Sequence, residues 1–200
     1  MNRQRRGGNP YVGDARTRQA RAQGFPARSV FKLEEIDRRT KLLKPGQRVV
    51  DLGAAPGSWS LYASERVGER GRVFAVDLQR IDQRFGSNVT VLEADALALD
   101  DAVLLDHGPF DVVLSDMAPA TSGARDLDQA RSHELFMRAL DVALRFGRVG
   151  SSYAAKLFMG PDFQVAKRSV AQHYAETRVL RPSGTRQRSF EVYVVGLKRN

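Results

Sequence analysis

The sequence contains no cysteine among its 200 residues and only three histidines. The absence of cysteine excludes disulfide bonds and thiolate metal ligands, and the scattered histidines do not offer the spacing of a zinc site, so we expect no metal. The sequence also lacks an apolar run long enough to span a bilayer, and its arginine-rich beginning lacks the apolar stretch of a secretion signal. These absences predict a cytoplasmic protein without a membrane partner.

Acidic residues are outnumbered, 23 against 32 Lys and Arg, which gives a formal net charge of +9. The excess lies in two segments, because residues 1–28 contain seven arginines and one aspartate, and residues 178–188 contain four arginines and no acid. A generally basic, solvated surface would spread this charge evenly. Two local patches instead indicate a nucleic-acid partner, since cations that contact phosphates release counterions. The arginines expected to contact it include Arg28, Arg181, Arg186 and Arg188.

Residues 1–24 are rich in Gly, Arg, Gln and Asn and lack apolar periodicity, which predicts a flexible basic arm that orders on binding. Residues 25–200 are expected to form one domain, because a 42% hydrophobic content suffices for one core and the composition does not change along the chain. We expect this domain to be a monomer.

Within the domain the apolar pattern alternates between that of strands and that of helices. Strands are predicted at 48–52, 72–76, 89–93, 110–115, 152–157, 177–180 and 191–197, and helices at 29–44, 58–67, 96–105, 127–146 and 160–174. This alternation predicts an α/β fold with a mostly parallel, doubly wound sheet. The last two strands have no helix between them, so we expect an antiparallel hairpin at one edge.

Residues 50–59 predict a strand, a glycine turn and a helix, the place where doubly wound sheets bind nucleotide-like ligands. Gly53 and Gly57 allow the backbone to approach a ligand closely. The segment lacks the G-x-G-x-x-G spacing of pyrophosphate sites, which argues against a dinucleotide. Asp77 and Asp95 follow the next two strands, where carboxylates can hold ribose hydroxyls and an adenine amino group. The alternative is that each acid only caps a helix or a turn.

Two further polar residues stand near the ends of later strands. Asp116 follows the fourth predicted strand, and Lys156 lies in a strand that is otherwise apolar. Such a lysine either reaches out to water from the strand end or has a function in the interior.

Together these residues resemble the FtsJ-like family of ribosomal RNA 2′-O-ribose methyltransferases. The resemblance extends from about residue 28 to residue 198, and its specific parts are residues 29–37, 51–59, 115–119, 156–158 and 188–193. It implies a Rossmann-like methyltransferase fold, S-adenosylmethionine as the methyl donor, and methylation of a uridine in large-subunit (23S) ribosomal RNA.

The resemblance also implies which residues form the site. The Lys-Asp-Lys-Glu tetrad of the family falls on Lys32, Asp116, Lys156 and Glu191. The cofactor-binding residues are expected at Gly53, Gly57, Trp59, Asp77, Asp95 and Asp116. A ribose hydroxyl is a weak nucleophile and needs a base as it attacks a methyl group, and a lysine serves as that base only when unprotonated. Lys156 is the expected base.

Two positions depart from the family pattern: Ser58 stands where a second glycine is usual, and Ser151-Ser152 replace part of a glycine pair. Three other functions remain open. The same 2′-hydroxyl chemistry serves methyltransferases of transfer RNA, of another structured RNA or of a messenger cap. An RNA-binding module without catalysis and a nicotinamide oxidoreductase are the other two. An intact tetrad argues against the module, and the turn spacing argues against the oxidoreductase.

Overall fold

The computed structural model describes residues 15–183, 185 and 189–200, to which all structural statements below refer. Helices and strands follow one another in the order α1 (Ala15–Ala22), α2 (Val30–Thr40), β1 (Arg48–Leu52), α3 (Ser58–Val67), β2 (Arg72–Asp77), β3 (Val89–Glu93), α4 (Asp101–His107), β4 (Phe110–Ser115), α5 (Arg125–Phe146), β5 (Gly147–Phe158), α6 (Phe163–Ala171), β6 (Tyr174–Leu180) and β7 (Glu191–Arg199). No described helix is both long and apolar enough to cross a membrane.

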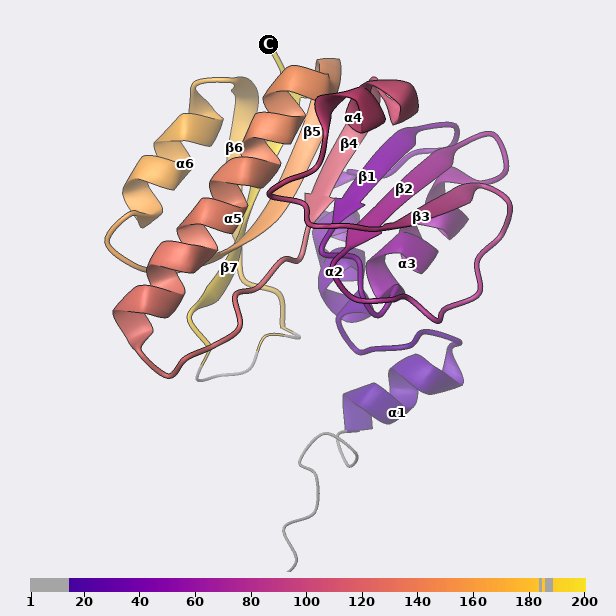
Figure 1. Ribbon diagram of the computed structural model, residues 1–200, viewed down its shortest axis with the longest axis horizontal. Coiled ribbons are helices and arrows are strands. Elements are labelled where there is room, and N and C mark those ends of the chain that lie inside the picture. The colour runs from indigo at the N-terminus through magenta and orange to yellow at the C-terminus, as the bar shows by residue number, and fades with distance from the viewer. Residues whose placement is uncertain (1–14, 184, 186–188) are drawn as a thin grey trace, which may run out of the picture.

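The seven strands form one sheet in the order β3-β2-β1-β4-β5-β7-β6. The first five in this order are parallel, whereas β7 runs antiparallel to both β5 and β6. The predicted α/β class and the antiparallel hairpin at the edge are therefore confirmed. Helices cover both faces of the sheet: α4, α5 and α6 lie in front of it in Figure 1, and α2 and α3 lie behind it.

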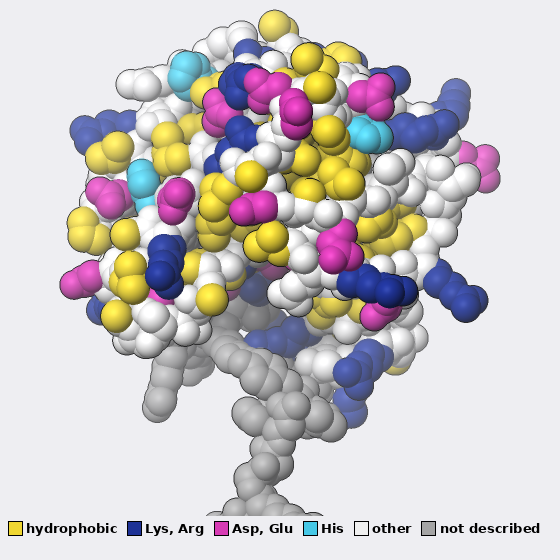
Figure 2. Space-filling model, in the orientation of Figure 1, with side chains coloured by type: hydrophobic (Ala, Val, Ile, Leu, Met, Phe, Trp, Pro, Cys, Tyr) yellow, Lys and Arg dark blue, Asp and Glu magenta, His cyan; other side chains and the backbone are white. Residues whose placement is uncertain are grey.

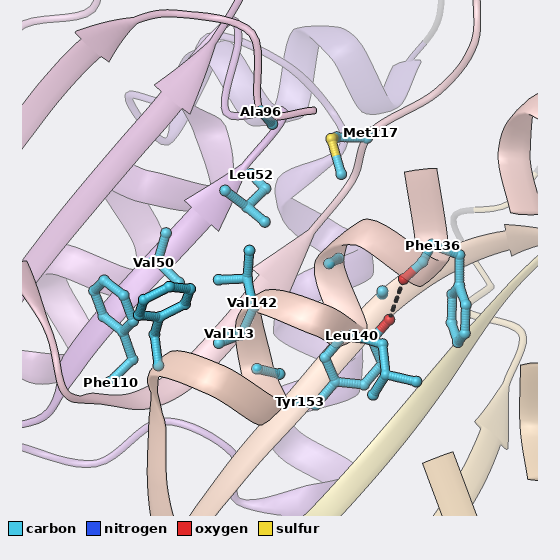
Figure 3. Close-up of a cluster of buried hydrophobic side chains, with 14 of the residues drawn as sticks. Val50, Leu52, Ala96, Phe110, Val113, Met117, Phe136, Leu140, Val142 and Tyr153 are labelled. Atoms are coloured by element: carbon cyan, nitrogen blue, oxygen red, sulfur yellow. Dashed lines mark hydrogen bonds between the residues drawn. The ribbon is translucent and has the colours of Figure 1, made fainter. Parts of the chain in front are cut away.

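The alternation of side chains along each strand gives the sheet two separate cores. Val50 and Val113 pack with residues of α5 on one face, as Figure 3 shows. Tyr153 of β5 reaches into this core, and its hydroxyl donates a hydrogen bond to the carbonyl of Phe136 at 3.0 Å. The neighbouring residues Val49, Val112 and Leu114 point to the other face and pack with residues of α2 and α3. Both faces of the parallel strands are thus buried, as their nearly continuous apolar sequences require.

Helix α1 lies within residues 1–24, the segment that was predicted to be a flexible basic arm. Residues 15–22 consist of Ala, Arg, Gln and Thr, and Ala, Arg and Gln are among the better helix formers. The helix has no apolar stripe, so its sequence carries no helical periodicity. Ala20 is nevertheless fully buried, and its carbonyl accepts a hydrogen bond from Phe25 N at 2.9 Å. Residues 1–14 of the predicted arm lie outside the described residues.

Several further elements begin elsewhere than predicted, and for α4 and β5 the structure shows why. Helix α4 begins at Asp101 because the side chain of Asp100 caps it, accepting a hydrogen bond from Ala102 N at 2.8 Å. Strand β5 begins at Gly147, directly after α5, and its pairing with β4 has an irregularity between Phe110 and Val112. An irregularity of this kind interrupts the alternation of side chains between the two faces of the sheet. The beginning of β5 therefore lacks the alternating apolar pattern that predicts a strand.

Candidate active site

Strand alternation brings the four predicted tetrad residues together. Leu114 of β4, Ala154 of β5 and Tyr193 of β7 all belong to the core that faces α2 and α3. Every second residue of a strand points to the same face of the sheet. Asp116 and Lys156 lie two residues after Leu114 and Ala154. Glu191 lies two residues before Tyr193 in the antiparallel strand β7, so all three are at the same end of these strands. They therefore face α2, which contributes Lys32.

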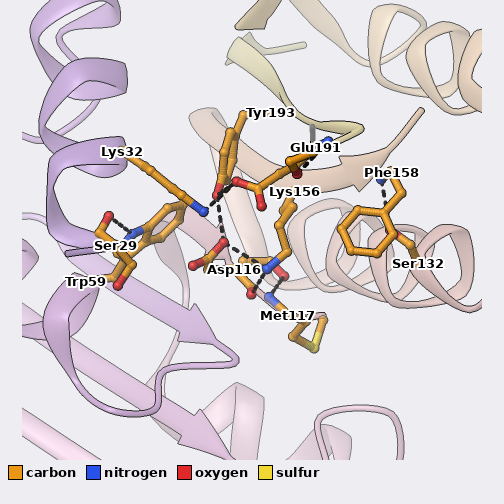
Figure 4. Close-up of polar contacts among 12 residues, drawn as sticks. Ser29, Lys32, Trp59, Asp116, Met117, Ser132, Lys156, Phe158, Glu191 and Tyr193 are labelled. Carbon is orange, nitrogen blue, oxygen red and sulfur yellow. Dashed lines mark hydrogen bonds and ion pairs between the residues drawn. The ribbon is translucent and has the colours of Figure 1, made fainter. Parts of the chain in front are cut away.

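Two ion pairs join these four residues, as Figure 4 shows. Lys32 Nζ lies 2.5 Å from Glu191 Oε1, and Lys156 Nζ lies 3.0 Å from Asp116 Oδ1. The Lys156 amine also donates a hydrogen bond to the Asp116 carbonyl oxygen at 2.5 Å. The side chain of Lys156 is only 6% exposed. Lys156 is thus held in the interior, which excludes the alternative of a strand-end lysine that reaches out to water.

Tyr193 links the two ion pairs, although its sequence context predicted no role for it. Its hydroxyl lies 2.7 Å from Asp116 Oδ1 and 2.9 Å from Glu191 Oε1. A phenol has one hydrogen and donates to one acceptor at a time. The hydroxyl therefore alternates between the two carboxylates. The signal that could have revealed Tyr193 is its position two residues after Glu191, on the same face of β7.

The environment keeps Asp116 charged and Tyr193 neutral. Burial raises the pKa of Asp116, but the positive charges of Lys156 and Lys32 and the Tyr193 hydrogen bond outweigh it, so that this pKa lies below its ordinary value. Burial raises the pKa of Tyr193 well above its ordinary value, and the negative charges of Asp116 and Glu191 raise it further. Tyr193 is therefore a hydrogen-bond donor throughout the physiological pH range.

A pocket of about 320 Å³ lies at the carboxyl ends of β1, β2, β3 and β4. Of the predicted cofactor residues, four line it: Gly53, Asp77, Asp95 and Asp116. Its other walls include the apolar side chains of Leu97, Met117 and Leu135 and the backbone that follows β2. Asp116 belongs to both the pocket and the tetrad, so the two are adjacent.

Backbone hydrogen bonds fix the carboxylates of this pocket. The two oxygens of Asp77 accept hydrogen bonds from Ala55 N and Gln79 N, each at 2.8 Å, and Asp95 Oδ1 accepts one from Leu97 N at 2.9 Å. These bonds resemble those of turn-capping acids, yet both side chains also line the pocket. Each carboxylate oxygen has a second lone pair that can accept a hydroxyl or amino group of a ligand.

Gly53 is required at the turn that follows β1. Its φ is +78°, a region that favours glycine, and a Cβ atom there would lie 2.6 Å from Met117 Cγ and 2.8 Å from the Met117 backbone. Any side chain at this position would force apart the loops that follow β1 and β4. The glycine therefore keeps one wall of the pocket in place.

Gly57 and Trp59 do not line this pocket. Gly57 has φ +106° at the beginning of α3. Trp59 is buried, its Nε1 donates a hydrogen bond to Ser29 O at 2.9 Å, and its ring centroid lies 5.6 Å from that of Tyr193. Trp59 thus connects α3 with the beginning of α2 and with the residue that links the ion pairs.

Ser58, which departs from the family pattern, joins the turn after β1 to the segment before α2. Its hydroxyl accepts a hydrogen bond from Ala27 N at 2.8 Å and donates one to Ala27 O at 3.1 Å. Ser58 is buried. The other departure from the family pattern includes Ser151, whose hydroxyl is buried without a hydrogen-bond partner among the described residues. We have no structural account of Ser151.

The predicted RNA-contacting arginines are only partly described. Arg28 and Arg181 are described, and Arg181 donates a hydrogen bond to Ser189 O at 2.7 Å, which joins the two sides of the β6–β7 loop. Arg186 and Arg188 lie outside the described residues. Figure 2 shows Lys and Arg side chains gathered toward the lower right of the molecule, where Figure 1 places α1. The rest of this face carries cations and acids side by side.

Comparison with known proteins gives concordant matches. The sequence profile of the FtsJ-like methyltransferase family matches residues 25–199. A Sorangium cellulosum protein named ribosomal RNA large subunit methyltransferase E is 56% identical over 192 residues, which cover 96% of this chain and 91% of that protein. A protein of the same name from Syntrophobacter fumaroxidans is 47% identical, with 90% and 92% covered.

Among solved structures, a Plasmodium falciparum protein described as a ribosomal RNA methyltransferase aligns with a TM-score of 0.76 at 22% identity, covering 86% of this chain and 97% of that chain. At this identity the match shows a shared fold.

Proposed function

The chain belongs to the FtsJ-like methyltransferase family, and on that premise we propose that it methylates a ribose 2′-hydroxyl of large-subunit ribosomal RNA. It is an S-adenosylmethionine-dependent methyltransferase, as the family and its relatives show. The observation that supports the proposed chemistry is the buried Lys156 amine, held by two acceptors of Asp116 beside the pocket that Asp116 also lines.

The residues of the pocket fit this methyl donor. Carboxylates at successive strand ends suit ribose hydroxyls and an adenine amino group, and Leu97, Met117 and Leu135 suit the faces of an adenine ring. We assign Asp77 to the ribose and Asp95 to the adenine. When bound, S-adenosylmethionine supplies a methyl group activated by the positive charge of its sulfur.

Lys156 accepts the proton of the ribose hydroxyl. The Lys156 ammonium of the ion pair must first release a proton. The neutral amine then has two hydrogens, directed to Asp116 Oδ1 and to the Asp116 carbonyl oxygen, and one lone pair. The lone pair is then left for the 2′-hydroxyl. When the ribose oxygen takes the methyl group that bound S-adenosylmethionine would supply, the hydroxyl proton would move to Lys156 Nζ. A positioned base of this kind contributes roughly 100- to 10,000-fold to a rate.

The other residues orient this base. Asp116 fixes the amine, Tyr193 fixes Asp116, and the Lys32–Glu191 ion pair fixes Tyr193 from the side of α2. The adjacency of the pocket and the base matters because alignment of donor and acceptor supplies much of the rate of such a transfer.

The relatives named as large-subunit ribosomal RNA methyltransferases support ribosomal RNA as the substrate. The local excess of arginine in residues 1–28 and 178–188 suits a large folded RNA. We further propose that the modified nucleotide is a uridine, that the enzyme acts as a monomer, and that it works in the cytoplasm. Transfer RNA or another structured RNA is the alternative substrate, because it offers the same 2′-hydroxyl.

The substrate is tested by mapping ribose methylation in ribosomal and transfer RNA from cells with and without this gene. We expect one 2′-O-methyl group in large-subunit RNA to disappear with the gene. Loss of a transfer RNA methylation with unchanged ribosomal RNA would refute the proposed substrate.

The base is tested by the pair Lys156→Ala and Lys156→Arg. Arginine keeps the positive charge beside Asp116 but does not deprotonate, so both variants are expected to be inactive while they still bind S-adenosylmethionine. Activity in Lys156→Arg close to that of the wild type would show that only the charge is needed, and would refute the assignment of Lys156 as a base.

A further inference from the structure

A second cavity, of about 290 Å³, lies between the beginning of α5, the β4–α5 loop and the ends of β5 and β7. Phe158 and Phe190 form part of its wall, together with the polar residues Thr121, Gln129 and Ser189 and the charged residues Arg125 and Asp128. Its volume is close to the lower limit for small-molecule sites, about 300 Å³. An apolar cavity with a few polar groups at its edge is the type of site that binds a planar, hydrogen-bonding molecule.

This cavity is adjacent to the tetrad. Phe158 is the cross-strand partner of Glu191, and Phe190 directly precedes Glu191. Phe158 also follows Lys156 by two residues, which corresponds to about 6–7 Å along a strand. Figure 4 shows Phe158 beside Lys156 and Glu191, on the side away from Lys32. The proposed base thus lies between the methyl-donor pocket and this second cavity.

Phe190 is the only aromatic residue among the exposed large apolar side chains of the described residues. It is a large apolar side chain with 49% of its surface accessible, next to a buried polar site. The guanidinium carbon of Arg125 lies 3.9 Å from the centroid of its ring. An exposed aromatic ring paired with an arginine is the combination that binds unstacked bases, because bases stack on aromatic rings and on guanidinium planes while the cation attracts the adjoining phosphate.

We propose that this second cavity binds an unstacked nucleobase of the substrate RNA, which stacks on Phe190 while the adjoining ribose faces Lys156. The proposal rests on the proposed function, since it assumes that RNA reaches the tetrad. A ribose inside a paired and stacked helix exposes its 2′-hydroxyl only from the shallow groove, whereas an extruded nucleotide can enter a site. Binding of the nucleobase would therefore place the 2′-hydroxyl between Lys156 and the methyl donor.

The test compares Phe190→Leu with Phe190→Trp. Leucine keeps an apolar side chain but has no ring to stack, whereas tryptophan keeps the ring. With large ribosomal subunits from cells lacking the gene as substrate, we expect Phe190→Leu to lower kcat/KM for RNA about tenfold or more and Phe190→Trp to stay within about threefold of wild type. The affinity for S-adenosylmethionine, measured by calorimetry, should not change in either variant. The matched control is Leu105→Ala, which removes a 68% exposed apolar side chain of α4, and it should not alter kcat/KM.

Two outcomes would overturn the nucleobase site. One is a Phe190→Leu enzyme with wild-type kcat/KM, because an apolar contact alone would then suffice. The other is an equal loss in the leucine and tryptophan variants accompanied by a lower melting temperature, because Phe190 would then only support the β6–β7 loop.

Binding of a fluorescent single-stranded oligouridylate separates this proposal from the proposed function. If the wild type binds the oligonucleotide and Phe190→Leu weakens that binding while Phe190→Trp does not, the nucleobase site is supported even where no ribosomal RNA is methylated. If the wild type methylates ribosomal RNA and all three proteins bind and react alike, the proposed function stands and the nucleobase site is refuted.

Discussion

Lys156 of β5 and Tyr193 of β7 are direct cross-strand partners, and both contact the same oxygen of Asp116. The lysine amine lies 3.0 Å from Asp116 Oδ1 and the tyrosine hydroxyl lies 2.7 Å from it. Cross-strand neighbours have Cβ atoms about 4.5–5.5 Å apart, so neither side chain moves without affecting the other. Tyr193 thereby takes part in orienting the proposed base.

The Tyr193→Phe substitution tests this positioning role. It keeps the ring against Trp59 and removes only the hydroxyl that Asp116 and Glu191 share. A hydrogen bond to a charged group contributes about 1.5–3 kcal/mol. We therefore expect kcat to fall roughly 10- to 100-fold in steady-state methylation assays, with KM for S-adenosylmethionine unchanged.

Tyr174→Phe is the matched control for that substitution. The Tyr174 hydroxyl is buried without a hydrogen-bond partner among the described residues, so its removal should leave kcat within about twofold of wild type. Equal rates in the wild type and in Tyr193→Phe would show that the lysine and aspartate are oriented without the phenol.

The fold could be predicted from the sequence wherever the apolar periodicity and the residues that end an element indicated the same boundary. Strands β1, β3 and β4 were predicted with the bounds that the structure has, because they are short runs that end at glycine or an acid. Helix α1 could not be predicted, because a helix that buries one alanine leaves no apolar pattern. The bulged beginning of β5 was missed for a similar reason.

The sequence predicted some residues of the site and missed the role of others. The family predicted from the motifs is confirmed, and the structure brings the four tetrad residues together. The role of Tyr193 was missed because a tyrosine in an apolar strand is indistinguishable from a core residue until the register of β5 and β7 is known. Gly57 and Trp59 were expected in the pocket wall because the resemblance implied them, and they are not among the residues that line the pocket.

Ser58→Ala is expected to destabilise the protein. The substitution leaves Ala27 N and Ala27 O without their partner at a half-buried position, and an unsatisfied polar group costs up to about 1–3 kcal/mol when it is buried. Urea unfolding should therefore show a free energy of unfolding lower by about 1–3 kcal/mol with an unchanged m value. Ser169→Ala, at a serine of α6 whose hydrogen bond to Val165 O is exposed to solvent, is the control and should change it by less than about 0.5 kcal/mol. A Ser58→Ala protein as stable as the wild type would mean that water replaces the hydroxyl.

Removal of residues 1–24 is expected to weaken RNA binding and to reduce its dependence on salt. This segment contains six arginines and one aspartate. Each phosphate contact contributes about 0.7–0.9 to the slope of log affinity against log salt concentration. The full-length triple variant Arg16→Gln, Arg18→Gln and Arg21→Gln keeps the segment and should lose part of the same slope. Affinities equal to the wild type at every salt concentration in both proteins would show that the segment does not contact RNA.

Asp51→Asn is expected to make stability less dependent on pH. Asp51 is fully buried, with one oxygen accepting the Ser60 hydroxyl at 2.6 Å and the other without a partner among the described residues. Burial raises its pKa from 3.8 to about 7, against the effect of the Ser60 hydrogen bond and together with the negative charges of Asp116 and Asp77. At a pH between these two pKa values, Asp51 is deprotonated in the unfolded chain and still protonated in the native protein.

The sign of the pH dependence follows from that difference. The native state binds more protons than the unfolded state between pH 4 and pH 7, so the contribution of Asp51 is fully present below pH 4 and is lost as the pH rises to about 7. Asparagine accepts the Ser60 hydroxyl and does not titrate. The free energy of unfolding of Asp51→Asn relative to wild type should therefore increase from pH 4 to pH 7, by a total on the order of 4 kcal/mol. The control Asp106→Asn, at an exposed carboxylate of α4, should show no such trend. Parallel pH profiles for Asp51→Asn and the wild type would mean that Asp51 is ionised in the native protein.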